Sequence, residues 1–422
     1  MPANLTLDSL RAAVQAGEID TVMVALADMQ GRLMGKRFHA AHFIENPDET
    51  HCCNYLLATD IEMNTVQGYQ ATGWAAGYGD YVMKPDLSTL RRLPWAPGTA
   101  FCMVDLYDHH THELIPHAPR SVLRSQIARA EAMGYTPMMA TELEFFLIDD
   151  SGGQLRVPPS PRSGKRRTGA ETLSLRALDA FDRFFTSLYD ACEAMDIPAD
   201  TAISEAALGQ FEINLMHQAD PLKAADDAWL FKLLIKGLAR QFGFAGSFMA
   251  KPYEHWNGSG MHMHFSVLDR DGNNIFDNGG DEGSAALRHA VAGCLDAMPG
   301  STLLFAPHEN SYDRLVPDSH APTGIGWAYE NRTSAIRIPA SGPKARRIEH
   351  RVAGGDVNPY LTVAAVLGAA LNGIEDGTEP SPPITGNAYE QGLAQLPTSW
   401  GEAIETFATS PQIRRIFPAH LI

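Results

Sequence analysis

The segment between Lys251 and Ser266 constrains this chain more than any other. It reads KPYEHWNGSGMHMHFS, so a flexible Asn-Gly-Ser-Gly turn leads directly into His262, His264 and Ser266 at alternating positions. Alternate residues of a β-strand lie on the same face, about 6–7 Å apart. A pair of histidines on one strand is more often structural than functional. The alternation therefore predicts a polar cavity only if other strands carry the same pattern.

Three further segments do carry it. Each alternates polar and apolar residues over a short stretch that is typical of a strand. Their polar positions are Glu142 and Glu144, then Glu205, Gln210 and Glu212, and then Arg347, Glu349 and Arg351. Four such strands predict one polar cavity that is lined by a sheet.

The glutamates of these segments predict a bound metal. Glu142, Glu144, Glu205, Glu212 and Glu349 outnumber the cations near them in the sequence. Buried carboxylates need a metal or a cationic partner to offset their charge. An oxygen-rich ligand set suits Mg²⁺ or Mn²⁺, and one imidazole among the ligands keeps Mn²⁺ acceptable.

Length and charge limit the classes of protein to which the chain can belong. A chain of 422 residues predicts two domains, and a hydrophobic content of 45% supports a large core. The formal net charge of −17 argues against nucleic acid or an anionic membrane as the main partner.

Targeting signals and membrane spans are not expected. The first twenty residues carry Asp8, Arg11, Glu18 and Asp20 without an apolar stretch, unlike a signal peptide. No run of eighteen apolar residues occurs. The five cysteines form no CxxC pair and are odd in number, which predicts reduced thiols and a cytoplasmic location.

The local patterns also predict an order of elements. A short helix should begin at Thr6 or Asp8 and end at Gly17, and residues 21–29 and 32–40 should form a hairpin. Residues 55–63 and 79–86 read as strands, and residues 117–134, 173–196 and 221–242 as helices. The stretch 151–171 should be a loop in which Lys165–Arg167 face solvent. A P-loop and a GxGxxG fingerprint are both absent from the sequence, so nucleotide binding cannot depend on either.

From about residue 20 to about residue 375 the chain resembles the glutamine synthetase superfamily. The Glu-x-Glu strand, GQFE, KP…NGSGMHMH, NSYDRLVP, ENRTSAIRIP and KARRIEHR…NPYL occur in the order and at the spacing of that family. The resemblance implies an α+β fold. It consists of a small N-terminal β-grasp domain, residues 1–110, and a larger catalytic domain, residues 111–422, whose curved antiparallel sheet is flanked by helices.

The resemblance assigns the metal ligands and the nucleotide contacts. One metal would be bound by Glu144, Glu205 and Glu212, and a second by Glu142, His262 and Glu349. The residues expected to contact ATP are His264, Ser266, Arg337, Lys344 and Arg347.

It also assigns the glutamate site and one catalytic group. Asn257 and Gly258 would bind the amino-acid end of L-glutamate, and Arg314 and Arg351 its carboxylates. Arg332 would lie near the reacting phosphate.

Two departures from true glutamine synthetases concern the amine that is joined. Those enzymes carry a glutamate on the loop after NSY-x-RL, whereas this loop reads LVPDSHAPTG, with His320 in that place. The Asp-Gly-Ser-Ser segment that binds ammonium is also missing, so Asp60 and Asp80 are the candidate aspartates. Trp74 and Tyr78 lie between them, and aromatic faces favour an alkylated ammonium ion.

The chain therefore resembles the γ-glutamylamide-forming branch of the family. We expect an ATP-dependent ligase that joins the γ-carboxylate of L-glutamate to a small primary amine, with methylamine as the first choice and His320 or Asp80 removing the proton. Putrescine, ethanolamine and ammonium remain alternative acceptors, and a catalytically inactive binding or structural homologue remains an alternative of another class. The expected assembly is a homo-oligomeric ring, a dodecamer of two hexameric rings, because the family site is built between neighbouring subunits.

Overall fold

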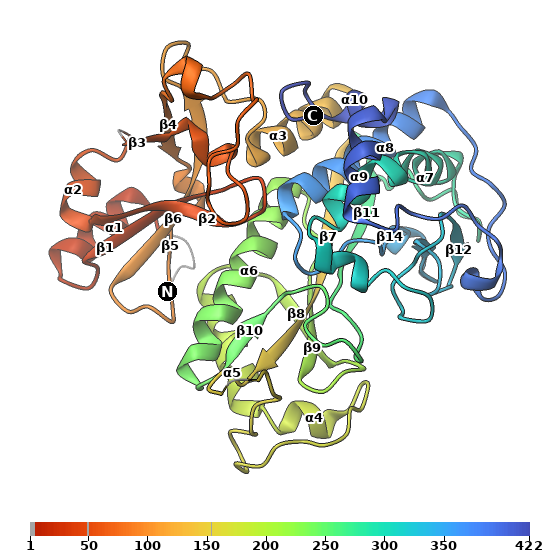
Figure 1. The fold of residues 1–422 in the computed structure, drawn as a ribbon, viewed down its shortest axis with the longest axis horizontal. Helices are drawn as coiled ribbons and strands as arrows, with labels where there is room; N and C mark the ends of the chain where they lie inside the picture. Colours follow the sequence, from red (N-terminus) through yellow and green to blue (C-terminus); the bar gives the residue numbers. More distant parts are fainter. Residues whose placement is uncertain (1–4, 49, 153) are drawn as a thin grey trace.

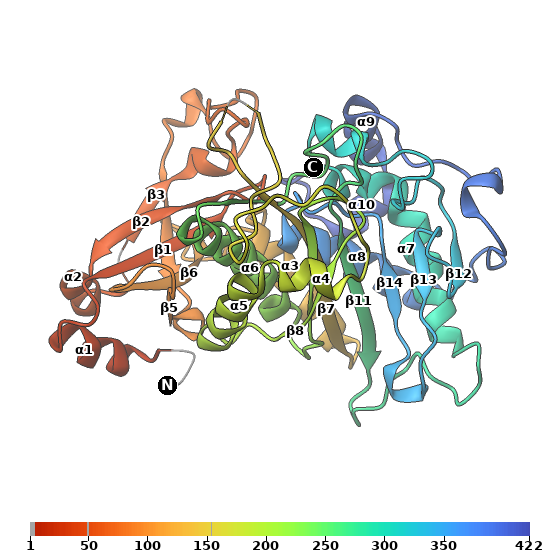
Figure 2. The same cartoon turned by 90° about the horizontal axis from the view of Figure 1, so that it is seen from below.

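Figures 1 and 2 show the computed structural model, which describes residues 5–48, 50–152 and 154–422. The N-terminal strands β1 to β6 gather on one side of the molecule and the later strands on the other. Both views place the long helix α6 (Pro221–Gln241) between these two groups of strands. The fold is the α+β arrangement that the sequence predicts.

The smaller, N-terminal sheet has six strands. They are β1 (Thr21–Ala27), β2 (Leu33–His39), β3 (Thr50–Cys53), β4 (Asp80–Pro85), β5 (Arg91–Arg92) and β6 (Thr99–Asp108). The order is β2-β1-β6-β4-β3, with β5 beside β6, and only β1 and β6 run parallel among these pairs. α1 (Leu7–Gln15) begins at a capping box made by Thr6 and Ser9, and α2 (Ala40–Glu45) follows β2. The predicted helix and hairpin are confirmed.

The predicted strand at residues 55–63 is wrong. The segment instead contains the 3₁₀-helix η1 (Asn54–Leu57) and then a turn at Asp60. The Asp60 carboxylate accepts hydrogen bonds from the backbone N–H groups of Glu62 and Asn64, both at 2.9 Å. Such side-chain to backbone bonding gives the chain an alternative to a sheet ladder. Two more 3₁₀-helices follow, η2 (Trp74–Ala76) and η3 (Leu87–Thr89).

The larger sheet has eight strands. They are β7 (Thr136–Ile148), β8 (Ala199–Ser204), β9 (Gln210–Leu215), β10 (Ala245–Ser247), β11 (Met261–Leu268), β12 (Trp327–Tyr329), β13 (Ile336–Ile338) and β14 (Ile348–His350). The order is β12-β13-β14-β11-β7-β9-β8, with β10 beside β7, and only β12 and β13 pair in parallel among them. On β7, Leu143 and Phe145 are fully buried in the core while the alternating glutamates face the other way.

Helices accompany this sheet. They are α3 (Pro119–Ala132), α4 (Leu175–Asp179), α5 (Asp182–Ala194), α6, α7 (Ala285–Phe305), α8 (Pro359–Asp376), α9 (Trp400–Thr409) and α10 (Pro411–Ile416). Helix α9 packs on α7, and α10 packs on α7 and α8. Short 3₁₀-helices occur at η4 (Glu309–Asp313), η5 (Pro343–Ala345) and η6 (Ala388–Glu390). Helices α7 and α8 pack closely because both have glycine at the crossing, where a Cβ on Gly293 would lie 2.1 Å from the Ala369 carbonyl oxygen.

Two of the three helices predicted for this part are continuous. The helix expected at residues 173–196 is instead divided between α4 and α5, with the break at Ala180 and Phe181. No helix in residues 5–48, 50–152 and 154–422 is long and apolar enough to cross a lipid bilayer.

Buried polar contacts join the two sheets. The guanidinium group of Arg120 on α3 contacts Asp105 of β6 at 2.6 Å and Asp226 of α6 at 2.7 Å. The Asn358 amide donates to the Asp28 carbonyl oxygen at 2.9 Å. Each sheet has a main cluster of buried hydrophobic residues, and the cluster of the larger sheet also includes Phe101 and Met103 of β6. We retain the division into residues 1–110 and 111–422 as a proposal.

Candidate active site

The sheet register brings the glutamates and histidines of four strands onto one face. Glu142 of β7 lies opposite His262 of β11, and Glu144 lies opposite Glu212 of β9. Glu349 of β14 lies opposite His264. Directly opposed residues of antiparallel strands have side chains close enough to share a ligand. The alternating polar residues of these strands therefore form a single polar surface.

Glu142 is common to two groups that could each hold a metal ion. The ligand atoms of Glu142, His264 and Glu349 lie within 4.8 Å of one another, as do those of Glu142, Glu212 and His262. The Nδ1 atom of His262 is 3.3 Å from Glu142 and 3.8 Å from Glu349. The Nε2 atom of His264 is 2.9 Å from the other Glu142 oxygen. His264, which the resemblance assigns to the nucleotide, thus lies among the metal ligands.

The charge on Glu142 and Glu349 is stabilised by their neighbours. Burial raises the pKa of Glu142, but hydrogen bonds with His262 and His264 outweigh it and hold the pKa well below its usual range. Burial also opposes ionisation of Glu349, yet the Arg351 guanidinium and the two histidines lower its pKa to about 2. Arg337 donates a further hydrogen bond to Glu349 at 2.7 Å. Both carboxylates are therefore anionic and ready to bind a cation.

The other carboxylates lack such compensation. Burial and the nearby charges of Glu144 and Glu142 raise the pKa of Glu205 to about 7. Burial and the same two neighbours raise the pKa of Glu212 well above its usual value. Glu205 lies just after β8 rather than on the strand, with Arg332 close enough to lower its pKa in part. The carboxylates of Glu142, Glu144, Glu205 and Glu212 are close enough to repel one another. A divalent metal ion bound between them would offset this repulsion.

A cavity of about 380 Å³ opens beside the metal-ligand groups. Three of the metal carboxylates and His262 line it, together with all four residues assigned to glutamate and both His320 and Arg332. Position 258 must be glycine, because a Cβ there would lie 2.2 Å from the Ala250 carbonyl oxygen. The side chain of Arg314 is buried and donates to the Val352 carbonyl oxygen at 2.7 Å.

The residues assigned to ATP lie on β11 and β13 and just before β14. His264 and Ser266 are buried on β11, and the Nε atom of Arg347 donates to Nδ1 of His264 at 3.0 Å. Arg337 lies on β13 against Glu349, and Lys344 is exposed in η5.

The residues assigned to the amine are elsewhere in the chain. Asp80 begins β4 and lines a separate hollow of about 470 Å³ with Asp108 and three histidines, His51, His109 and His110. Trp74 is 74% exposed and packs edge to face on Tyr78 at 5.0 Å between ring centroids. Within one chain, neither these residues nor Asp60 line the cavity beside the metal ligands.

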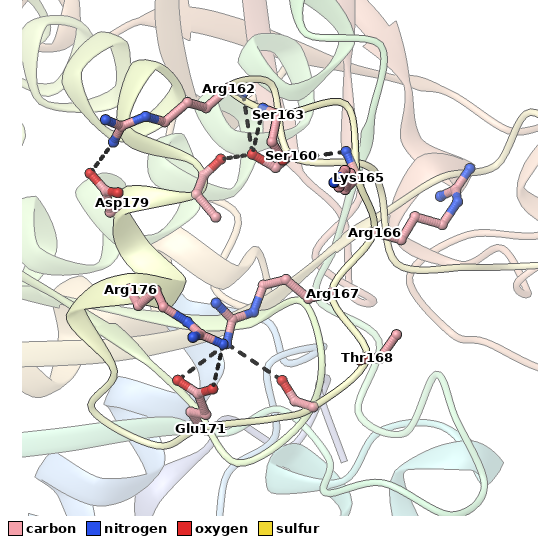
Figure 3. Close-up of a pocket in the computed structure, with 12 residues that line it drawn as sticks. Ser160, Arg162, Ser163, Lys165, Arg166, Arg167, Thr168, Glu171, Arg176 and Asp179 are labelled. Atoms are coloured by element: carbon pink, nitrogen blue, oxygen red, sulfur yellow. Dashed lines mark hydrogen bonds and ion pairs between the residues drawn. The ribbon is translucent and has the colours of Figure 1, made fainter.

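The basic loop exposes Lys165 and Arg166, as predicted, but Arg167 is partly buried, and most of the loop's arginines are paired (Figure 3). It borders a hollow of about 490 Å³. Arg162 contacts Asp179, Arg166 contacts Asp149, and Arg167 lies 3.4 Å from Glu171. These ion pairs offset the repulsion between the neighbouring arginines of the loop.

Sequence reasoning missed several residues that line the cavity. Leu173, Ile203 and Ala206 form part of its wall. Gln210 was noted for its position, and its amide donates to the Gly258 carbonyl oxygen at 2.9 Å. The GQFE segment signalled Gln210, but nothing in the local pattern signalled Leu173.

Comparison with known proteins gives one consistent result. Residues 116–422 match the family model described as the glutamine synthetase catalytic domain. The chain is 39% identical to the γ-glutamylethanolamide synthetase of Streptomyces coelicolor, over 98% of this chain and 89% of that one. It is 34% identical to the γ-glutamylputrescine synthetase of Escherichia coli, over 93% and 84% of the two chains. It is 35% identical to a glutamate–isopropylamine ligase of a Pseudomonas species, over 98% and 91%.

A solved structure gives the same answer at the level of the fold. The ADP complex of GmaS superposes with a TM-score of 0.84 at 26% identity, and the match covers 98% of this chain and 93% of that one. The curved sheet, the carboxylate and histidine groups on its face and the matches in sequence all agree. The chain belongs to the glutamine synthetase family, as an ATP-dependent carboxylate–amine ligase of its γ-glutamylamide-forming branch.

Proposed function

We propose that this enzyme joins the γ-carboxylate of L-glutamate to a small primary amine, with methylamine as the first choice. The observation that carries the proposal is the cavity in which metal carboxylates, arginines and His320 meet. A carboxylate oxygen is a poor leaving group, so amide formation needs prior activation. The γ-carboxylate oxygen attacks the terminal phosphorus of ATP, and ADP leaves. The amine nitrogen then attacks the acyl carbon, inorganic phosphate leaves, and the nitrogen loses a proton.

The chain's own residues position these groups. Phosphoryl transfer depends mainly on alignment and on neutralising charge. Glu144, Glu205 and Glu212 on one side, and Glu142, His262 and Glu349 on the other, would hold Mg²⁺ or Mn²⁺, which would offset the phosphate charge. For the nucleotide we assign His264, Ser266, Arg337, Lys344 and Arg347.

The remaining cavity residues suit glutamate. Arg314 and Arg351 would bind its carboxylates, and Asn257 and Gly258 its amino-acid end. Arg332, which lies near Glu205, would stabilise the transferred phosphoryl group.

Proton removal falls to His320 or Asp80. His320 lines the cavity and has a φ of 64°, a backbone conformation that non-glycine residues rarely adopt outside functional or turn positions. Asp80 lies on the small sheet, away from the cavity of its own chain. We therefore propose that the small sheet of one subunit, with Asp60, Trp74, Tyr78 and Asp80, completes the cavity of its neighbour. This requires a homo-oligomeric ring, for which a dodecamer of two hexamers is the assembly we propose.

A diamine is the second candidate, and one observation favours it. A diamine needs another carboxylate for its far ammonium group, and Asp108 lines the same hollow as Asp80. Backbone N–H groups of His110 and Thr111, each at 2.8 Å, fix one oxygen of Asp108 and lower its pKa, so the carboxylate is anionic.

The test is ADP release by the purified protein with ATP, L-glutamate and Mg²⁺ or Mn²⁺. The acceptors are ammonium, methylamine, ethylamine, ethanolamine and putrescine. We expect methylamine to exceed ammonium at least tenfold in kcat/KM, about 1.4 kcal/mol. A preference for putrescine that Asp108→Asn abolishes would favour the diamine, and a preference for ammonium would reject the γ-glutamylamide function. No stimulation by any amine would identify an inactive homologue.

A further inference from the structure

Leu173 combines three properties that an ordinary surface leucine lacks. Its φ is 56°, in the left-handed region that residues other than glycine, asparagine and aspartate rarely adopt. Its side chain is 69% exposed, and it lines the cavity that holds the metal carboxylates. Strained residues of this kind persist where surrounding structure holds them in place, and they gather at functional sites.

Ser204 holds the backbone of this residue in place. The N–H of Leu173 donates to the Ser204 carbonyl oxygen at 2.8 Å, and the N–H of Ser174 donates to the Ser204 hydroxyl oxygen at 2.7 Å. The Ser204 hydroxyl donates in turn to the Glu171 carbonyl oxygen at 2.8 Å. Ser204 is buried and directly precedes Glu205. Leu173 is thereby fixed next to a proposed metal ligand.

The other side of the segment is braced as well (Figure 3). The Glu171 carboxylate accepts a hydrogen bond from the Ser174 hydroxyl and contacts Arg176 at 3.3 Å and Arg167 at 3.4 Å. Residues 171–174 are thus held between Ser204 and two arginines. These contacts, rather than the movement of a free loop, place Leu173 at the cavity.

Leu173 is also one of four aliphatic residues in the lining of a cavity that is otherwise polar. Ile203, Ala206 and Ala321 are the other aliphatic residues that line it. Ammonium has no carbon atoms that could contact these aliphatic side chains, whereas an alkylamine buries apolar surface against them.

We propose that Leu173 is a specificity-determining residue that contacts the alkyl group of the acceptor amine. The inference rests on the proposed function and names the residue that separates an alkylamine from ammonium in the same cavity. Because residues 171–174 are held in place, the size of the side chain at position 173 determines the length of the alkyl group that fits.

The experiment compares Leu173→Asn with Leu175→Ala. Asparagine is close to leucine in size and tolerates a positive φ, so it replaces the apolar contact with little change in the backbone. Leu175 is 80% exposed at the start of α4 and is not among the residues that line the cavity, which makes it a matched control. We measure kcat/KM for ammonium, methylamine, ethylamine and propylamine, together with KM for glutamate.

The expected result is a loss of about tenfold in kcat/KM for methylamine and ethylamine relative to ammonium in Leu173→Asn. Leu173→Ala should move the optimum towards propylamine because it deepens the cavity. Leu175→Ala should leave the amine profile unchanged. Equal losses for all acceptors in both Leu173 variants, or the same shift in Leu175→Ala, would overturn the inference.

The design separates failure of this inference from failure of the proposed function. If the wild-type enzyme prefers an alkylamine and the Leu173 variants retain that preference, Leu173 does not determine specificity although the function stands. If the wild-type enzyme prefers ammonium, the proposed function itself fails. An unchanged melting temperature and an unchanged KM for glutamate show that a variant is folded.

Discussion

In the eight-stranded sheet, one chain brings the groups proposed for phosphoryl transfer together. Two groups of three side chains that could each hold a metal ion share Glu142, and the ligand atoms of each group lie within 4.8 Å of one another. On the six-stranded sheet, Asp80 lies in a separate hollow with Asp108 and three histidines. The first region comes together within one subunit, and we propose that the second completes the cavity of a neighbouring subunit. The proposed dependence on a neighbouring subunit therefore concerns the second region alone.

The largest effect should come from the residue on which the first region converges. Replacing Glu142 with glutamine keeps the shape of the side chain but removes the charge shared by both metal groups. We expect ADP release to fall roughly a thousandfold, about 4 kcal/mol, because the phosphate charge is no longer offset. The measurement is steady-state ADP release at saturating Mg²⁺ or Mn²⁺.

Glu113→Gln is the control for this change. Glu113 is an exposed glutamate in the loop after β6. It should retain full activity. A Glu142→Gln enzyme with more than a tenth of wild-type activity would show that Glu142 is not central to metal binding.

The second prediction concerns the separation between the metal candidates around Glu142 and the hollow that contains Asp80. Asp80→Asn should lower amide formation by about a hundredfold while glutamate binding survives, because proton removal is lost and the cavity is untouched. Alone, Asp80→Asn and Glu142→Gln subunits are each expected to be nearly inactive. Hybrid rings should recover part of the activity, because an intact small sheet can then meet an intact cavity. Activity is measured after mixing, dissociation and reassembly.

The hybrid experiment can fail in two informative ways. Native mass spectrometry establishes whether hybrid rings have formed. Verified hybrids without activity would mean that each cavity is completed within its own chain. An unchanged rate in Asp80→Asn alone would dismiss Asp80 as the proton acceptor and leave His320.

The smallest effect should appear in stability rather than in rate. Burial and neighbouring carboxylates raise the pKa of Glu205 to about 7. A carboxyl group whose pKa is higher in the folded state binds more protons there, so its contribution to stability is present below the unfolded pKa and is lost as pH rises through 7. Burial lowers the pKa of His217 to about 4 and that of His350 to about 3, which acts in the opposite direction. We therefore expect the metal-free protein to lose a few degrees of melting temperature between pH 5 and pH 8 relative to Glu205→Gln.

Metal and mutation should both remove this decline. Mn²⁺ or Mg²⁺ would bind the ionised carboxylates and restore stability at pH 8. Glu205→Gln should flatten the dependence without metal. A metal-free protein with the same pH dependence as Glu205→Gln would contradict the proposed repulsion among the carboxylates.

Much of the active site could be predicted because alternation along a strand specifies a face. Glu142 and Glu144 on β7, and His262 and His264 on β11, had to lie on one face of the sheet once these segments became strands. The motifs also identified the family and with it the α+β fold. The strand predicted at residues 55–63 failed because the Asp60 carboxylate bonds to nearby backbone N–H groups, an interaction that apolar patterning does not reveal.

By itself, the sequence determined which side chains are candidates for the chemistry and which of them share a face, because residue type and strand period are local properties. Only the tertiary structure decided which of them meet. It placed His264 beside Glu142 and put Asp108 in the hollow of Asp80. It also held Leu173 at a positive φ through contacts with Ser204, thirty-one positions further along the chain. These outcomes depend on how strands distant in sequence pair, and pairing is set by the packing of the whole sheet.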